Sequence, residues 1–270
     1  MTDIQTTDRQ GSRIAGLPLF LFSLVAYGLF LACFGLFLSF LGGWGWHEGI
    51  TGSLPLVRLA PEEGAGLDGI VVGTLANMAL VVAFGLQHSL MARKGVKAAM
   101  ARIFPKGGMR ILYVFASSAT LIGIMLLWQP LPGTVWHVEG EALRTLMWVG
   151  HVFGWVLLMA SVFELDFLDF TGLAEGIAAL RGQERQTGGE FRTPFLYRFV
   201  RHPLMTGLLI GLWCIPTMST SVFAMVLGFT AYIFIGLVYE ERDLVAEFGD
   251  TYRAYKLTTP SLFPNPFRKG

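Results

Sequence analysis

The stretch LMTGLLIGLWCIPTMSTSVFAMVLGFTAYIFIGLVY, residues 204–239, decides the fold of this chain. It is apolar almost throughout and is longer than the roughly 20 residues that one helix needs to cross a bilayer. Pro216 and the polar letters TMSTS interrupt it, and a proline removes a backbone donor that a continuous helix would use. The stretch therefore predicts a helix–turn–helix hairpin in which one helix is short.

Four more apolar segments precede the hairpin, at residues 17–41, 70–91, 111–128 and 143–163. Each has about the length of a bilayer-spanning helix, and the first is too long for the core of a signal peptide. The composition agrees, because 53% of the 270 residues are hydrophobic, only 14% are charged, and the mean hydropathy is +0.56. We expect an all-α integral membrane protein with about five spans, in which the hairpin gives six helical segments.

Lysine and arginine are distributed unevenly between the two sides of these spans. Of the twenty such residues, only Arg58 and Arg144 fall on the side that follows the first and third spans. Loops 45–68 and 129–142 on that side are rich in Gly, Pro and Trp, and predict short ordered caps. The positive-inside rule places the basic side in the cytoplasm. We therefore expect both termini in the cytoplasm, in a multi-pass protein of a bacterial-type inner membrane.

The chain shows no polar or Pro/Ser-rich linker, so residues 1–270 are expected to form one membrane-embedded domain. Within it, residues 1–165 would form a four-helix bundle, 166–202 a cytoplasmic connector, and 203–270 the hairpin and a C-terminal binding tail. The formal net charge of +1 gives no reason to expect nucleic acid or an acidic partner. No obligate protein partner is evident, and the lipid bilayer is the expected environment.

Two pairs of small residues occur in the predicted helices, Gly150 with Gly154 and Gly207 with Gly211. Small residues four apart let two helix backbones approach closely in a membrane. We interpret both pairs as helix-packing positions.

Charged residues stand at both ends of the apolar hairpin. The letters RFVRHP before it include Arg201 and His202, and the letters YEER after it include Glu240 and Glu241. Continued helical periodicity puts Glu241 on the apolar face, where a carboxylate needs a partner. Because a hairpin brings its two ends together, these segments should be neighbours in a cytoplasmic-side pocket. Cations and carboxylates together suit a zwitterionic, nucleoside-bearing ligand, although no soluble nucleotide-binding motif and no zinc-ligand spacing is present.

Polar side chains also lie inside the predicted spans. Thr74, Asn77 and His88 share one helical stripe of the second span, and ionisable groups in a membrane usually face the bundle interior. His88 either hydrogen-bonds to a neighbouring helix or belongs to a site that opens to the cytoplasmic half. His151, in the middle of the fourth span, is more typical of a packing residue.

Three acids end the fourth span, in the letters SVFELDFLDFTGL. Glu164, Asp166 and Asp169 alternate there with phenylalanines on the side where basic residues dominate. Acids at a helix end are commonly just solvated. Their setting between aromatic residues is also compatible with the rim of a polar pocket.

The C-terminal motifs follow an ordered pattern: RHP, a glycine four residues after the proline, the apolar hairpin, EE, then FGDTYRAY and a proline-rich end. This order resembles the superfamily of isoprenylcysteine carboxyl methyltransferases and phospholipid methyltransferases. Those enzymes usually have tyrosine where Met205 stands. With Met205 and the segments LQHSLMAR and FELDFLDFTGL, the chain is more similar to the methanethiol S-methyltransferase branch, which is related to NnrU-like proteins.

The resemblance implies S-adenosyl-L-methionine as cofactor, with no metal, and methylation of a small thiol, most simply methanethiol to dimethyl sulfide. The implied cofactor-binding residues are Arg201, His202, Pro203, Gly207, Tyr197, Glu240, Glu241, Tyr252 and Tyr255. A thiol must lose its proton to react, so a general base is needed, with His88 the first candidate and Asp166 and Glu164 the second. The alternatives are methylation of another thiol, an isoprenylcysteine or a lipid, an NADPH-dependent sterol-type reductase, and a non-enzymatic sensor or carrier.

Overall fold

The computed structural model describes residues 2–42, 67–105, 107–183, 185 and 191–264, with backbone alone for 2–14. Among these residues, five helices are long and apolar enough to cross a membrane, and one further apolar helix is shorter. The predicted all-α integral membrane protein with a short extra helix is thereby confirmed.

The elements follow each other along the chain as a series of long helices with short helices and two strands between them. Their bounds are α1 Thr2–Gly42, α3 Leu67–Ala92, α4 Lys94–Met100, α5 Met109–Leu127, β1 Thr134–His137, α6 Glu141–Leu165, α7 Phe167–Phe170, α8 Leu173–Leu180, η1 Leu196–Arg198, α9 Pro203–Trp213, β2 Thr217–Ser219, α10 Thr220–Phe248 and α11 Asp250–Thr258. The candidate membrane helices are α3, α5, α6, α10 and the part of α1 from Ala15 onward.

The apolar hairpin consists of α9 and α10. Helix α9 ends at Trp213, three residues before Pro216, and Ser219 then begins α10 by accepting the backbone N–H of Val222 at 3.1 Å. The two helices are joined by a hydrogen bond from Trp213 Nε1 to Thr230 Oγ1 at 3.0 Å. The predicted break at the proline is confirmed, and α9 is the short helix.

The sequence pattern locates the other membrane helices well but misses several smaller elements. Helices α1, α3, α5 and α6 contain the predicted spans almost entirely, although α1 starts at Thr2, well before the apolar segment that begins at residue 17. The strands, α4, α7, α8, η1 and α11 were not predicted. Loop 129–142 contains β1, which pairs antiparallel with β2. Loop 45–68 lies outside the described residues up to residue 66.

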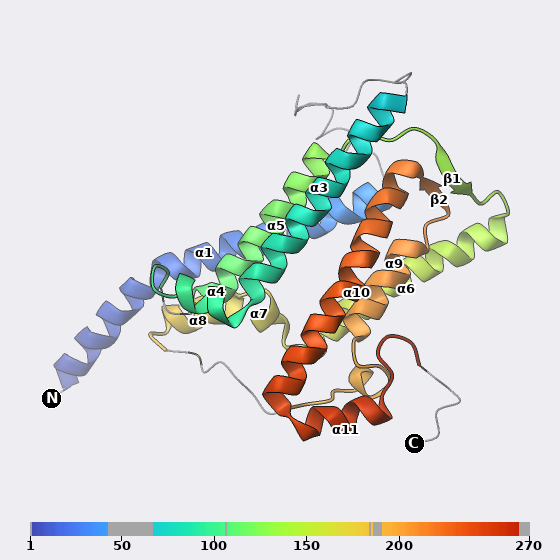
Figure 1. Cartoon of the computed structure of the whole chain (residues 1–270). Coiled ribbons are helices and arrows are strands. Elements are labelled where there is room, and N and C mark those ends of the chain that lie inside the picture. The colour runs from blue at the N-terminus through green and yellow to red at the C-terminus, as the bar shows by residue number, and fades with distance from the viewer. Residues whose placement is uncertain (1, 43–66, 106, 184, 186–190, 265–270) are drawn as a thin grey trace. The chain divides into compact units, whose positions relative to one another are not determined.

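The chain divides into two compact units that alternate along the sequence. The first unit holds α1, the second half of α3, α4, α5, α7 and α8 (Figure 1). The second unit holds the first half of α3, β1, α6, η1, α9, β2, α10 and α11. Chain order therefore does not define the units, because α3 contributes to both.

Glycines determine the packing of α6 against α9 in the second unit. A Cβ on Gly154 would collide with the backbone of Gly211, and one on Gly207 would lie 2.6 Å from the carbonyl oxygen of Gly154. A Cβ on Gly150 would lie 2.9 Å from Cys214 Sγ. The two small-residue pairs thus face each other, which confirms their predicted packing role.

In the first unit α1 packs against α5 and α8. A Cβ on Gly176 of α8 would overlap the side chain of Ser23 of α1, and one on Gly16 would overlap the backbone of Ala179. Gly172 precedes α8 with φ +78°, a conformation that glycine adopts without strain. These small residues bring the short helix α8 against the membrane helix α1.

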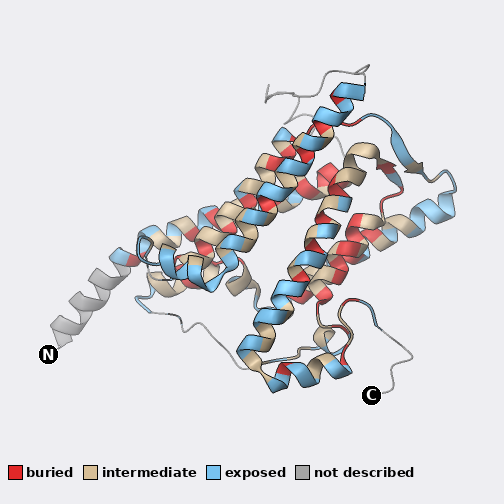
Figure 2. Cartoon of the chain, in the orientation of Figure 1, coloured by how far each residue is buried: buried red, intermediate tan, exposed pale blue. Residues whose placement is uncertain are grey.

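The burial pattern matches a protein surrounded by lipid. Figure 2 shows buried residues where helices of a unit face each other and exposed residues along their outer sides. Large apolar side chains, among them Leu75, Leu146, Phe163 and Ile235, are more than half exposed on the membrane helices. Lipid tails cover such surfaces without cost, so these residues are expected on the outside of a membrane protein.

Candidate active site

The structure brings the two ends of the hairpin together at Glu241, in the second unit. Arg201 donates from Nε to Glu241 Oε1 at 2.8 Å and again from Nη2 to the same oxygen. His202 Nε2 lies 3.2 Å from this oxygen, and Lys256 Nζ lies 2.6 Å from Oε2. The predicted proximity of RFVRHP and YEER is confirmed. We call Arg201, His202, Glu241 and Lys256 the carboxylate cluster.

Local structure explains why these side chains meet. His202 directly precedes α9, and Pro203 occupies the first helical turn, where a missing N–H has no cost. Glu241 follows the buried Leu237 by one turn on the inward face of α10. The side chains of Arg201 and Glu241 are only 9% and 15% exposed. Charges this deep must be paired, and the cluster pairs them.

Arg201 also ties the C-terminal segment to the start of α9. Its Nη1 donates to the carbonyl oxygens of Lys256 and Thr259, and its backbone N–H donates to the carbonyl of Pro260 at 2.8 Å. The guanidinium therefore uses most of its five N–H groups within the protein. Its position fixes α11 and the residues after it against α9 and α10.

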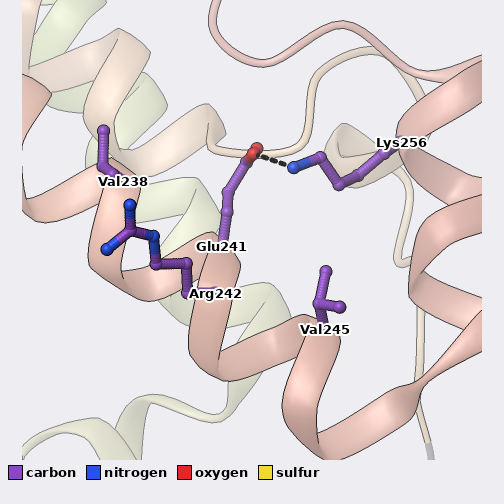
Figure 3. A pocket seen from close by; sticks show the side chains of 5 residues that line it. All are labelled: Val238, Glu241, Arg242, Val245 and Lys256. Carbon is purple, nitrogen blue, oxygen red and sulfur yellow. Dashed lines mark ion pairs between the residues drawn. The ribbon is translucent and has the colours of Figure 1, made fainter.

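An open pocket of about 360 Å³ lies beside the cluster. Its lining consists of Val238, Glu241, Arg242, Val245 and Lys256. Figure 3 shows Lys256 reaching Glu241 from α11, while Arg242 turns back along α10 toward Val238. The volume falls within the range of about 300–1,000 Å³ that is typical of small-molecule sites. The pocket thus combines one carboxylate, two cations and two apolar side chains.

The three tyrosines that the sequence suggested also lie in this unit. The Tyr255 hydroxyl donates to the carbonyl oxygen of Tyr197. Burial raises the pKa of Tyr252 and of Tyr255 to about 12 and also raises the pKa of Tyr197, so all three hydroxyls stay protonated at neutral pH. The hydroxyl of Tyr252 is buried near Arg201 and donates no hydrogen bond within the described part of the chain.

Phe191 is a site residue that sequence reasoning missed. It lies in the segment before η1, and its ring centre is 5.3 Å from those of Phe248 and Tyr255 and 5.8 Å from that of Tyr252. These four rings fill the junction of α10 and α11. No sequence period places Phe191 there, because it belongs to an irregular segment.

Glu240 and Gly207 differ from Glu241 in their surroundings. The Glu240 side chain is 46% exposed, and its Oε2 lies 3.7 Å from His202 Nδ1. Gly207, one turn into α9, lies against Gly154 and Leu158 in the contact with α6. Glu240 is therefore the more accessible carboxylate, and Gly207 serves close helix packing.

Glu164 is engaged at the end of α6. Both of its carboxylate oxygens accept the backbone N–H of Leu196, at 3.0 and 3.3 Å. This bond fixes the start of η1, the turn that carries Tyr197. The structure thus gives Glu164 a positioning contact within the second unit.

His88 lies in the first unit and holds two hydroxyl groups. Its Nε2 is 2.6 Å from the Tyr113 hydroxyl, and its Nδ1 is 3.0 Å from Ser117 Oγ. Either neutral tautomer of the ring satisfies both hydrogen bonds. Phe84 stacks on the ring with centroids 5.2 Å apart. Tyr113 was not singled out from the sequence, since it lies on another helix, α5.

The polar stripe of α3 does not act as one group. Asn77 binds both backbone groups of Gln129, each at 2.8 Å, and Thr74 bonds to a carbonyl of its own helix. His151, in α6, is buried, and its Nδ1 lies 2.7 Å from the carbonyl oxygen of Gly211. His151 is therefore the packing residue that its sequence context indicates.

Asp166 and Asp169 belong to a second group of charges, in the first unit. Asp166, with φ 104°, begins α7 by accepting the N–H groups of Leu168 and Asp169, each at 3.1 Å, and it pairs with Arg185 at 3.1 Å. Asp169 pairs with Arg110 at 3.2 Å. The N–H of Asp169 and then Arg185 hold the pKa of Asp166 below its usual value. We call Arg110, Asp166, Asp169 and Arg185 the connector cluster.

Lys256 is the charged site residue that the sequence could have revealed. Tyr252 and Lys256 are four residues apart in α11, so they share one face of that helix. Because Tyr252 is the buried residue of α11, the face that carries Lys256 packs inward. Extending the helical period beyond FGDTYRAY would have added this lysine to the cluster.

The chain is similar to several known proteins. The family model described as NnrU protein matches residues 77–252. Methanethiol S-methyltransferase 2 of Bradyrhizobium diazoefficiens is 36% identical, over 94% of this chain and 93% of its own length. Methanethiol S-methyltransferase of Mycobacterium tuberculosis is 34% identical, over 86% and 94%. Nurim of Sus scrofa is 30% identical, over 72% and 80%. No solved structure matches the chain.

Proposed function

The chain belongs to the NnrU protein family, and we propose that it is a membrane methyltransferase that converts methanethiol to dimethyl sulfide. Its relatives named methanethiol S-methyltransferase match 94% and 86% of the chain. A substrate as small and apolar as methanethiol can arrive through the lipid, so the site needs no large substrate tunnel. The proposed methyl donor is S-adenosyl-L-methionine.

The observation that carries this proposal is the carboxylate cluster at the open end of the hairpin. Glu241 binds Arg201, His202 and Lys256 beside a pocket that also contains Arg242. A mere charged flank of a membrane helix does not require residues from α11 and from the segment before α9 to converge on one carboxylate of α10. Polar groups that converge beside a pocket with some apolar lining are typical of a ligand site.

The residues present fit a zwitterionic nucleoside cofactor. When bound, S-adenosylmethionine supplies a methyl group on a positively charged sulfur that is already activated for transfer. The pocket offers both signs of charge for the cofactor's amino-acid end. The buried Tyr252 hydroxyl is a donor without a partner among the described residues, which a bound ligand could satisfy after a small rearrangement.

We assign different roles to the predicted binding residues. Arg201 is a positioning residue, because its guanidinium holds Glu241 and two carbonyl groups of the C-terminal segment. Glu240, which is 46% exposed, lies at the more open side of the cluster, 3.7 Å from the buried His202. A site that excludes water strengthens such charge interactions and keeps the reacting groups aligned.

His88 is our proposed acceptor of the thiol proton. A thiol with a pKa of about 8.5 is mostly protonated at neutral pH, so a base is needed beside it. Tyr113 and Ser117 already hydrogen-bond to the two ring nitrogens, and a proton delivered to either hydroxyl can pass to the ring. Asp166 and Glu164 are weaker candidates, because their oxygens accept backbone N–H groups.

The proposed site faces the cytoplasm. Only Arg58 and Arg144 among the lysines and arginines fall on the opposite side in the predicted topology. The residues of the carboxylate cluster lie at the basic ends of α9, α10 and α11. The cofactor is then drawn from the cytoplasm and the thiol from the membrane.

The activity is tested with purified full-length protein in detergent or nanodiscs. Methanethiol and methyl-labelled S-adenosylmethionine are added, and dimethyl sulfide is measured by gas chromatography. We expect labelled dimethyl sulfide from the wild type and a strong loss in His202→Ala. Label found in another thiol or in lipid would mean that this molecule, and not methanethiol, is the substrate. Binding of NADPH with no methyl transfer would overturn the proposal in favour of a reductase.

The role of His88 is tested by His88→Gln. Losing a general base lowers kcat by about 10²–10⁴-fold, while the affinity for S-adenosylhomocysteine should stay unchanged. The control is Thr74→Val, a change on the same helix at a hydroxyl that bonds only to its own helix turn in the described contacts. Equal losses of kcat and cofactor affinity in His88→Gln would make this histidine structural.

A further inference from the structure

We propose that the pocket beside Glu241 receives the amino-acid end of the cofactor, with Glu241 binding its α-ammonium group and Lys256 its α-carboxylate. The inference rests on the function proposed above and adds Lys256 to the binding residues. It starts from one contact, the ion pair of 2.6 Å between Lys256 Nζ and Glu241 Oε2.

The charges of the pocket match those of an α-amino acid. Such a group carries one positive and one negative charge a few bonds apart. An ion pair that opens can accept it between its two members, so that each charge meets its opposite and the net charge of the site is unchanged. Hydrogen bonds between charged groups are about twice as strong as neutral ones, which favours this exchange over a neutral ligand group.

Lys256 is the member of the carboxylate cluster best able to move. Arg201 is 9% exposed, and its guanidinium binds two carbonyl groups besides Glu241. Lys256 is 36% exposed and reaches Glu241 at the end of a flexible stem (Figure 3). Arg201 therefore holds Glu241 in place while Lys256 turns to a ligand carboxylate.

The other residues that line the pocket also fit the amino-acid end of the cofactor. Arg242 lines the pocket and adds positive charge there, and its guanidinium lies 5.7 Å from the ring centre of Tyr239. Val238 and Val245 give apolar surface for the methylene groups that join an amino-acid end to sulfur. One carboxylate, two cations and a short apolar wall correspond to a thioether amino acid.

The test compares two ligands that differ only at this end. S-adenosylhomocysteine carries the amino acid, whereas 5′-methylthioadenosine keeps the adenosine and the thioether but lacks it. Binding of each to the full chain in detergent is measured by isothermal titration calorimetry, for the wild type and for Lys256→Met. We expect Lys256→Met to raise the Kd of S-adenosylhomocysteine by about tenfold or more and to leave that of 5′-methylthioadenosine unchanged.

Two further variants serve as controls. Arg253→Met removes a cation from the same helix, but one that is 60% exposed and pairs with Asp250 at the surface, so both affinities should stay at the wild-type values. Lys256→Arg keeps the charge and should recover most of the affinity for S-adenosylhomocysteine. Thermal unfolding of each variant shows whether the fold is retained, and Lys256→Gln replaces Lys256→Met if the latter is unstable.

The outcomes separate this inference from the proposed function. If Lys256→Met weakens both ligands by the same factor, or neither, Lys256 does not bind the amino-acid end and the inference is wrong. That result would leave the proposed function unaffected, because the methyltransferase assay on the wild type tests it separately. If the wild type binds neither ligand and forms no dimethyl sulfide, the proposed function itself is wrong.

Discussion

The carboxylate cluster and the connector cluster use the same kinds of side chain in different surroundings. In the connector cluster, Arg185 pairs with Asp166 and Asp169 at 3.1 and 3.4 Å, and the side chains are 32–49% exposed. In the carboxylate cluster, Arg201 and Glu241 are 9% and 15% exposed. Pairing with arginine is common to both, and burial is the difference.

Burial changes what these pairs can do. An exposed ion pair contributes about 0–1 kcal/mol, because water screens its charges. A largely buried pair gains little net stability either, but removing one partner leaves a charge that water cannot reach. A ligand that offers the missing charge can then bind strongly. The connector cluster therefore stabilises a local shape, while the carboxylate cluster is suited to binding.

The largest expected effect comes from Glu241→Gln. It leaves Arg201 facing a neutral amide and removes the partner of Lys256. Breaking a buried ion pair lowers the free energy of unfolding by about 3–5 kcal/mol. This variant should be near the lower value, because the amide oxygen of glutamine still accepts a hydrogen bond. We expect dimethyl sulfide formation to be lost and the affinity for S-adenosylhomocysteine to fall at least about 100-fold. Calorimetry measures the affinity, thermal unfolding measures the stability, and gas chromatography measures the dimethyl sulfide.

The matched change is Asp169→Asn, which also removes one carboxylate charge beside two arginines, Arg110 and Arg185. It should leave cofactor affinity unchanged and lower the stability only slightly. If Asp169→Asn weakened the cofactor as much as Glu241→Gln does, the contrast between the two clusters would be wrong.

The carboxylate cluster was largely predictable from the sequence, because it depends on regular structure. Pro216 marks the turn of the hairpin, and helical periodicity puts Glu241 on the apolar face. Two ends of one hairpin must lie close together, so Arg201 and His202 were expected near Glu241. Lys256 was not predicted, although the same helical periodicity, continued for one more turn of α11, would have placed it near Glu241.

The other contacts depend on irregular segments and on separate helices, where periodicity gives no information. Asp166 caps α7 with a positive φ of 104°, and Glu164 fixes η1 through a single backbone N–H. His88 hydrogen-bonds to Tyr113 and Ser117, both on α5, and no spacing along the chain relates them to it. Such contacts follow from tertiary packing, and the periodicity of a single sequence does not reveal them.

A smaller effect is expected from Glu175→Gln, in the first unit. Glu175 is 7% exposed, and its Oε2 has no hydrogen-bond partner within the described residues. Burial raises its pKa and Asp169 raises it further, against the opposing effect of Arg185 and Arg110. A raised pKa means that the folded state favours the neutral acid, so this stabilisation is lost as the pH rises through the folded pKa.

The glutamine variant stays neutral at every pH. We expect it to unfold a few degrees above the wild type at pH 8, with the difference disappearing near pH 4.5, the ordinary pKa of glutamate. Thermal unfolding followed by intrinsic fluorescence over this pH range measures it. A difference that does not change with pH would mean that Glu175 is neutral throughout or that the substitution acts through packing.

The smallest effect is expected from Asp166→Asn, which removes a charge that is about half exposed but keeps the cap of α7. Asparagine caps helices as well as aspartate does and tolerates a positive φ, so only the pairing with Arg185 is lost, less than about 1 kcal/mol. Because the pKa of Asp166 is lowered in the folded state, this contribution is present above its ordinary pKa of 3.8 and is lost as the pH falls through the lower folded value. The melting temperatures of variant and wild type should therefore differ slightly at pH 5–8 and converge below about pH 3.8. Dimethyl sulfide formation should be unchanged, and a large loss of kcat at intact stability would instead place Asp166 among the groups that take the thiol proton.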